Sequence, residues 1–146
     1  MMRSMKEILF ICTGNFYRSR FAEAWINFEA RRRSIPWRAF SRGLGLKDQG
    51  DLSPYTREAM ERRAIPMDHT APRPVGLTAD CLARAHRAIA LKRAEHQPAM
   101  YSRFPDWARD VEYWDIHDID VWSPDQGIAE LELRLLRLLP ELKENP

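Results

Sequence analysis

The clearest chemical potential in this sequence lies in a cysteine that is followed, six positions later, by an arginine. Cys12 and Arg18 enclose five residues, between an apolar run and a segment with helical periodicity. In a loop that joins a buried strand to a helix N-terminus, successive backbone N–H groups can surround one anion. The sequence therefore predicts a phosphate-binding loop made of Thr13, Gly14, Asn15, Phe16, Tyr17, Arg18 and Ser19.

The same loop suits a cysteine nucleophile. A helix N-terminus and a nearby arginine favour the thiolate, which is the reactive form near neutral pH. Arg18 has a planar fork that can hold two phosphoryl oxygens as charge spreads in the transition state, and Ser19 can donate to the sulfur as it leaves. The spacing is a weak signal by itself in a chain rich in arginine, but Gly14 and Asn15 tolerate the backbone angles of a tight loop. We therefore predict that Cys12 and Arg18 are catalytic residues that act on a phosphate monoester.

Strands and helices alternate around this loop. Strands are predicted at 7–11, 37–40, 87–91 and 111–114, and helices at 20–33, 53–64, 78–85, 95–103 and from 123 onward, where Leu131, Leu135, Leu138 and Leu142 form one stripe. This order predicts an α/β fold: one doubly wound, four-stranded parallel sheet of flavodoxin-like type with helices on both faces. Ligands of such sheets bind beyond the C-terminal ends of the strands, which is where Cys12 falls.

Length and charge bound the remaining possibilities. A chain of 146 residues predicts a single domain over residues 1–146. The net charge is only +2 and the basic residues are scattered, so nucleic acid is not expected as a partner. No apolar stretch approaches the roughly 20 residues of a membrane span, and the N-terminus lacks the core of a signal peptide. A cytoplasmic protein without membrane contact is therefore expected, and the sequence carries no signal for its oligomeric state.

The two cysteines are too few for a disulfide scaffold. The four histidines show no short ligand spacing with either cysteine, so no metal site and no cofactor are predicted. Cys81 lies on a short predicted helix among apolar residues, and a cysteine in that setting is typically part of the core.

At the cysteine loop the sequence resembles the low-molecular-weight protein tyrosine phosphatase family. Its signature reads Cys, any residue, Gly, Asn, two residues, Arg, Ser, and residues 12–19 match it. The likeness covers nearly the whole chain: residues 41–43 stand where the family has Ser-Ala-Gly, and His69 stands where it has a histidine. The resemblance implies the phosphotyrosine phosphatase I type of fold and hydrolysis of a phosphorylated protein, most of all phosphotyrosine, or of a small aryl phosphate. It also implies a hydrogen-bonded network around the loop, formed here by Asn15, Ser19, Ser41 and His69.

Family members carry their general acid, an aspartate usually followed by proline, on a late loop after Trp-Asp-Ile-Pro. The resemblance assigns this role to Asp118 in the segment Trp114-Asp115-Ile116-His117-Asp118. His117 and Ile119 stand where the family has prolines, so the loop has less conformational restriction. Asp115 and Asp120 therefore stay open as alternative acids.

Three further departures from the family pattern keep other functions open. Tyr17 stands where many members keep a second cysteine, Arg20 where they have proline, and His86 where they have aspartate. An arsenate reductase that uses an external thiol is one alternative, although this chain lacks the extra resolving cysteines of such enzymes. A non-catalytic phosphate-binding module is another. The loop at 44–51 and the surroundings of Trp122 are predicted to form the walls of the cleft.

Overall fold

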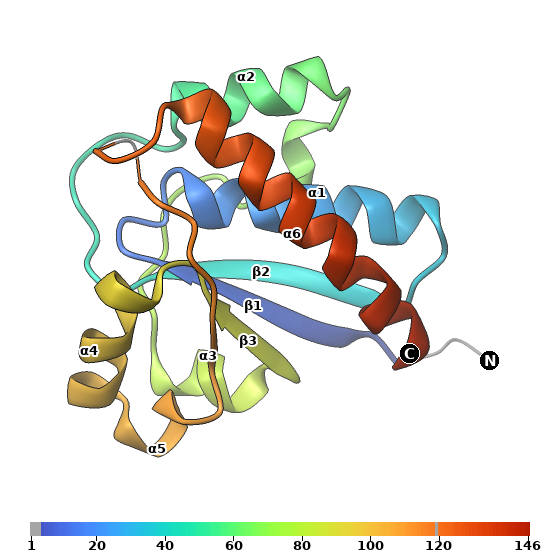
Figure 1. Cartoon of the computed structure of the whole chain (residues 1–146). Coiled ribbons are helices and arrows are strands. Elements are labelled where there is room, and N and C mark those ends of the chain that lie inside the picture. The colour runs from blue at the N-terminus through green and yellow to red at the C-terminus, as the bar shows by residue number, and fades with distance from the viewer. Residues whose placement is uncertain (1–3, 119) are drawn as a thin grey trace.

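The computed structural model describes residues 4–118 and 120–146, which are built around one parallel sheet. Its strands are β1 (Lys6–Cys12), β2 (Trp37–Gly43), β3 (Arg87–Ala90) and β4 (Glu112–Tyr113), paired in the order β2-β1-β3-β4 (Figure 1). The chain moves outward from β1 in one direction to β2 and in the other to β3. The end of β1, at Cys12, is therefore the switch point where ligands of such sheets bind.

Helices cover both faces of this sheet, which confirms the predicted fold class (Figure 1). They are α1 (Arg18–Arg32), α2 (Pro54–Arg62), the 3-10 helix η1 (Met67–His69), α3 (Ala79–Arg84), α4 (Arg93–Arg103), α5 (Pro105–Ala108) and α6 (Pro124–Glu144). Alternate residues of β1 enter two cores: Ile8 and Phe10 pack with α1, α2 and α6, whereas Leu9 and Ile11 pack with α3, α4 and α5. The predicted leucine stripe of α6 is buried in the first core.

Local sequence signals explain where the helices begin and end. Ser123 and Gln126 form a capping box at the start of α6, and Thr78 caps α3. Ser53 caps α2 and Pro54 occupies its first turn. Two elements had no clear pattern and were not predicted, the single turns η1 and α5.

The second strand is longer than predicted because residues 41–43 continue to pair with the end of β1. Ser41 lies beside Phe10, and Gly43 lies beside Cys12. A Cβ atom at Gly43 would lie only 2.6 Å from the Thr13 carbonyl oxygen, so a larger residue would push the cysteine loop away from β2. The fourth strand is shorter than predicted, since Val111 and Trp114 lie outside it.

Candidate active site

The loop after β1 has its carbonyl groups turned outward. Five of these oxygens accept hydrogen bonds from neighbouring segments: Cys12 from Leu44 N, Thr13 from Gly45 N, Asn15 from an Arg20 nitrogen, Phe16 from Ser53 N and Tyr17 from Thr56 Oγ1. In a trans peptide the N–H group points opposite to the C=O group. The N–H groups of this loop are therefore expected to face the enclosed side, together with the first turn of α1, as a cup of the kind that binds anions in other proteins.

The sulfur of Cys12 lies within this cup, and the residue is 3% exposed. The Asn15 N–H group donates to Sγ at 3.3 Å, and Asn15 itself has a positive φ of 50°. The Ser19 hydroxyl is 2.9 Å from the same sulfur. A non-glycine residue in the left-handed region is strained and stays there only when its neighbours hold it, and Asn tolerates that region better than most residues.

The direction of the Ser19 hydrogen bond follows from the Asn15 side chain. Val75 N donates to Asn15 Oδ1 at 2.8 Å, so the amide NH₂ group must face the other way. Nδ2 donates to Ser19 Oγ and to Ser41 Oγ, both at 2.9 Å. Because Ser19 Oγ accepts from Asn15, its own hydrogen is free to point at Cys12 Sγ. This arrangement stabilises a negatively charged sulfur.

Arg18 is buried beside the cup with a 3% exposed side chain. One terminal nitrogen donates to the Ile116 carbonyl oxygen at 3.0 Å. The other donates to Glu95 Oε2 at 2.9 Å and to Asp118 Oδ2 at 3.4 Å. Burial works to lower the pKa of Arg18, but the negative charges of Cys12, Asp118 and Glu95 raise it above its usual value, so the guanidinium stays cationic.

Glu95 is a site residue that the sequence analysis missed. It lies in the first turn of α4, and its Oε2 accepts from the Thr13 hydroxyl and from Arg18. His96 Nε2 lies 2.8 Å from the same oxygen, in an orientation outside that of a regular hydrogen bond, while its Nδ1 accepts from Lys92 N. His96, Thr13 and Arg18 together hold the pKa of Glu95 well below its usual range, so it stays ionised. The available signal was an acidic residue just after β3, at the sheet edge where Cys12 lies.

We expect Glu95→Gln to lower kcat/KM on p-nitrophenyl phosphate about tenfold, because a neutral amide holds the Arg18 fork less firmly than a carboxylate. Steady-state kinetics check this, with Glu130→Gln on the exposed face of α6 as the matched control. Equal or higher kcat/KM in Glu95→Gln would mean that Glu95 holds Arg18 away from its substrate rather than toward it.

A pocket of about 210 Å³ opens above the cysteine loop. It is lined by Cys12, Thr13, Gly14, Phe16, Tyr17, Arg18, Lys47, Gln49, Ser53, Pro54, Tyr55 and Asp118. Three aromatic residues, Phe16, Tyr17 and Tyr55, therefore line the cavity together with Cys12, and Asp118 is the acidic residue in its lining. The predicted loop at 44–51 contributes Lys47 and Gln49, whereas the second wall comes from the start of α2 rather than from Trp122. Trp122 instead packs edge-on against His117, with ring centroids 4.4 Å apart.

The structure separates the three candidate acids. Asp118 lines the pocket and contacts Arg18, with a side chain that is 41% exposed. Asp115 and Asp120 are exposed, and neither lines the pocket. Ile119 lies outside the described residues.

His69 is not where the resemblance puts it. Its ring packs edge-on against Phe28, with centroids 5.8 Å apart, and its carbonyl oxygen accepts from Asn27. Among the described residues, the predicted network therefore joins Asn15, Ser19 and Ser41 but not the His69 ring. The place near Ser41 is taken by Glu23 and Thr70, because η1 ends at His69 and turns the chain so that the next residue faces inward.

The remaining departures from the family pattern also have defined places. Tyr17 packs against α6, where an added Cβ at Gly127 would lie 2.7 Å from its hydroxyl oxygen. Burial and the nearby Asp118 raise the pKa of Tyr17 to about 12, so it stays protonated and donates to the Pro124 carbonyl oxygen. His86 accepts from Glu7 N at the beginning of β1, far along the sheet from Cys12. Cys81 lies on α3, where it is buried in the core and contacts Thr78, as expected of a core cysteine.

No group of three or more potential metal ligands occurs within residues 4–118 and 120–146. Over the same ranges, none of the helices has the length and apolar character needed to cross a membrane.

The loop at the switch point brings a buried cysteine, an arginine and a carboxylate to one pocket. This combination is typical of cysteine-dependent phosphatases that are built on a parallel α/β sheet. The sequence model described as low molecular weight phosphotyrosine protein phosphatase matches residues 7–145. The chain belongs to this family, which confirms the resemblance noted from its loop.

Individual relatives agree with this assignment. A protein-arginine-phosphatase of Bacillus subtilis (strain 168) is 28% identical over 151 residues, which cover 95% of this chain and 98% of the relative. The crystal structure of a YwlE mutant from Bacillus subtilis is similar with a TM-score of 0.80 and 26% identity, over 94% of this chain and 99% of that one. YfkJ from Bacillus subtilis has a TM-score of 0.86 at 21% identity, over 98% of both chains, and supports the fold.

Proposed function

We propose that this phosphatase hydrolyses phosphotyrosine on proteins, or small aryl phosphates, through a cysteinyl-phosphate intermediate. The observation that carries this proposal is that Cys12 shares its pocket with three aromatic residues, Phe16, Tyr17 and Tyr55. A phosphoryl group bound in the cup would direct its aryl group along these rings. Aromatic pairs gain free energy beyond their buried area, so such walls favour a phenyl ester over an alkyl ester.

The proposed reaction has two steps and needs no cofactor. In the first, the Cys12 thiolate forms an S–P bond while the bond between phosphorus and the phenolic oxygen breaks, and Asp118 gives its proton to that oxygen. Arg18 and the loop N–H groups stabilise the charge on the equatorial oxygens. In the second, Asp118 takes a proton from water as the water oxygen bonds to phosphorus, and the S–P bond breaks to restore the thiolate.

Asp118→Asn should reveal the acid through its dependence on the leaving group. We expect kcat for phenyl phosphate to fall about 10²–10³-fold, because a poor leaving group needs protonation, and kcat for p-nitrophenyl phosphate to fall less than about tenfold. Asp115→Asn and Asp120→Asn are the matched controls. A larger leaving-group effect in either control than in Asp118→Asn would move the acid to that residue.

Phosphoarginine is the second candidate substrate. The observation in its favour is the relative named protein-arginine-phosphatase, which aligns with 95% of this chain. A guanidinium leaving group could lie against the same aromatic rings through cation–π contact. The phosphorus–nitrogen bond would then break in place of a phosphorus–oxygen bond, with the same nucleophile.

Two peptides of one sequence, carrying either phosphotyrosine or phosphoarginine, distinguish these candidates. We expect kcat/KM for the phosphotyrosyl peptide to exceed that for the phosphoarginyl peptide at least about tenfold. The reverse ratio would assign the chain to phosphoarginine. Turnover of neither peptide nor of p-nitrophenyl phosphate, with phosphate still bound, would favour the non-catalytic module, and arsenate reduction with added thiol would favour the reductase.

A further inference from the structure

Two charged side chains on the first turns of α1 are buried, and neither lines the active-site pocket. Arg20 is 1% exposed and Glu23 is 5% exposed. Removing two charges from water is costly unless good hydrogen bonds compensate for the lost hydration. A buried ion pair often contributes little to the free energy of folding, so the presence of Arg20 and Glu23 in the core calls for a role other than stability.

The guanidinium of Arg20 joins three segments that are far apart in the sequence. One terminal nitrogen donates to the carbonyl oxygens of Asp51, at 2.7 Å, and of Asn15, at 3.4 Å. The other donates to the Ala71 carbonyl oxygen, and Nε donates to Thr70 Oγ1 at 2.7 Å. Arg20 therefore ties the cysteine loop to the segment before α2 and to the segment after η1.

One oxygen of Glu23 collects donors from the same surroundings. Oε1 accepts from Thr70 Oγ1 at 2.6 Å, from Ser41 Oγ at 3.1 Å and from Ala71 N at 3.3 Å, and it lies 3.8 Å from Arg20 Nε. Burial raises the pKa of Glu23 above its usual value, while the bonds from Thr70, Ala71 and Ser41 and the charge of Arg20 oppose this rise.

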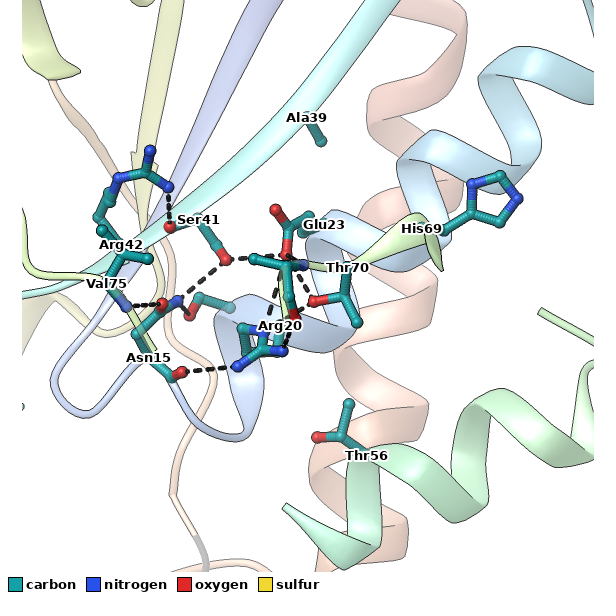
Figure 2. Close-up of polar contacts among 12 residues, drawn as sticks. Asn15, Arg20, Glu23, Ala39, Ser41, Arg42, Thr56, His69, Thr70 and Val75 are labelled. Atoms are coloured by element: carbon teal, nitrogen blue, oxygen red, sulfur yellow. Dashed lines mark hydrogen bonds and ion pairs between the residues drawn. The ribbon is translucent and has the colours of Figure 1, made fainter. Parts of the chain in front are cut away.

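These contacts form a closed ring that begins and ends at Asn15 (Figure 2). The Asn15 amide donates to Ser41, Ser41 donates to Glu23, Thr70 donates to Glu23, and Arg20 donates both to Thr70 and to the Asn15 carbonyl oxygen. Asn15 is thus held at its side chain and at its backbone, in the left-handed conformation that directs its N–H group at Cys12 Sγ.

Glu23 also sets the direction of the hydrogens in this ring. As an acceptor it takes the hydroxyl hydrogen of Ser41, which leaves the Ser41 lone pairs for the Asn15 amide. The second hydrogen of that amide goes to Ser19, whose own hydrogen then points at the sulfur. Figure 2 shows the His69 ring turned away from this cluster, whereas Arg20, which stands where the family has proline, contacts both Thr70 and the Asn15 carbonyl oxygen.

We propose that Arg20 and Glu23 are positioning residues for Cys12: they hold Asn15 in its strained conformation and direct the hydrogen bonds of Asn15 and Ser19 onto the sulfur. This role rests on the proposed function only in that Cys12 is the nucleophile. The ring itself is observed within the described residues and can be tested without any substrate.

Alkylation of Cys12 by iodoacetamide across a pH series is the first test, with Cys12 and Cys81 quantified separately by peptide mass spectrometry. In Arg20→Met and in Glu23→Gln we expect the rate at pH 7 to fall about tenfold, with the midpoint of the pH curve about one unit higher, because the sulfur loses oriented donors. The exposed Arg57→Met is the matched control, and His69→Ala should stay within about twofold of the parent chain.

A double variant separates positioning from folding. Arg20→Met/Glu23→Met removes both buried charges, so its melting temperature should equal or exceed those of the single variants. If the pair positions Cys12, the double variant still alkylates slowly and its kcat on p-nitrophenyl phosphate is still about tenfold or more below that of the parent chain. Recovery of both stability and Cys12 reactivity in the double variant would overturn the proposal.

The same measurements distinguish a failure of the positioning role of Arg20 and Glu23 from a failure of the proposed phosphatase function. Slow alkylation in the variants, combined with a parent chain that turns over no phosphate ester, would support the ring and reject the phosphatase assignment. Normal alkylation in Arg20→Met and Glu23→Gln, combined with an active parent chain, would reject the ring and keep the phosphatase. A loss in His69→Ala that Arg20→Met does not share would return the role to the histidine.

Discussion

Replacing Cys12 with serine is expected to lower kcat on p-nitrophenyl phosphate by at least about 10⁴-fold, because a neutral hydroxyl cannot take the place of a thiolate nucleophile at neutral pH. The exchange changes one atom, and the Asn15 and Ser19 contacts around that atom have room for an oxygen. The cup of N–H groups and Arg18 should therefore still bind inorganic phosphate. Steady-state kinetics together with calorimetric titration of phosphate check both halves of this expectation.

Cys81→Ser is the matched control for this exchange. Cys81 is also buried, but it lies on α3, in the core that α3, α4 and α5 form, and it contacts Thr78 rather than the cysteine loop. Its replacement should leave kcat within about twofold of the parent chain. Substantial turnover by the Cys12→Ser chain would exclude a cysteinyl-phosphate intermediate and with it the proposed mechanism.

Arg18→Lys should cause the second largest loss, with kcat about 10³-fold lower and phosphate binding about tenfold weaker. A lysine keeps the charge but has no planar fork, so it cannot hold two phosphoryl oxygens and at the same time contact Ile116 and Glu95 as Arg18 does. The loss in kcat should exceed the loss in phosphate affinity because the contact between Arg18 and the phosphoryl oxygens strengthens in the transition state.

Arg38→Lys serves as the control because Arg38 is exposed on β2. A drop in phosphate affinity in Arg18→Lys that equals the drop in kcat/KM, with kcat unchanged, would restrict Arg18 to substrate binding. Combining Arg18→Lys with Glu95→Gln then measures whether the two residues act as one unit, since the effects of residues in contact are not additive.

The catalytic pair of Cys12 and Arg18 depends on two sets of supporting side chains. Arg20 and Glu23 act on Asn15 and Ser19, whereas Glu95 acts on Arg18. Nucleophile and arginine are thus held by separate networks that reach the cysteine loop from opposite faces of the sheet, through α1 and through α4. Losses from the two networks should therefore add nearly independently when variants are combined.

The features that could be predicted from the sequence are local ones. The run from β1 through the cysteine loop into α1, the caps at Ser53, Thr78 and Ser123, and the leucine stripe of α6 all follow from residues within a few positions of one another. Strand and helix periods, caps and turn residues act over that range, and they sufficed for the parallel α/β fold and for the pairing of Cys12 with Arg18.

The side chains that meet in the site from distant parts of the sequence become visible only in the folded chain. Glu95 contacts Arg18 although the two residues are 77 positions apart. Asp118, rather than Asp115 or Asp120, lines the pocket because of the course of one loop. A single turn at Met67–His69 turns the histidine outward so that Thr70 contacts Glu23. Such contacts depend on how loops pack on a finished sheet, where one residue of shift exchanges an inward side chain for an outward one. The spacing of residues along the chain carries no signal for that choice, so the sequence could not show that Glu23 and Thr70 take the place expected for the histidine.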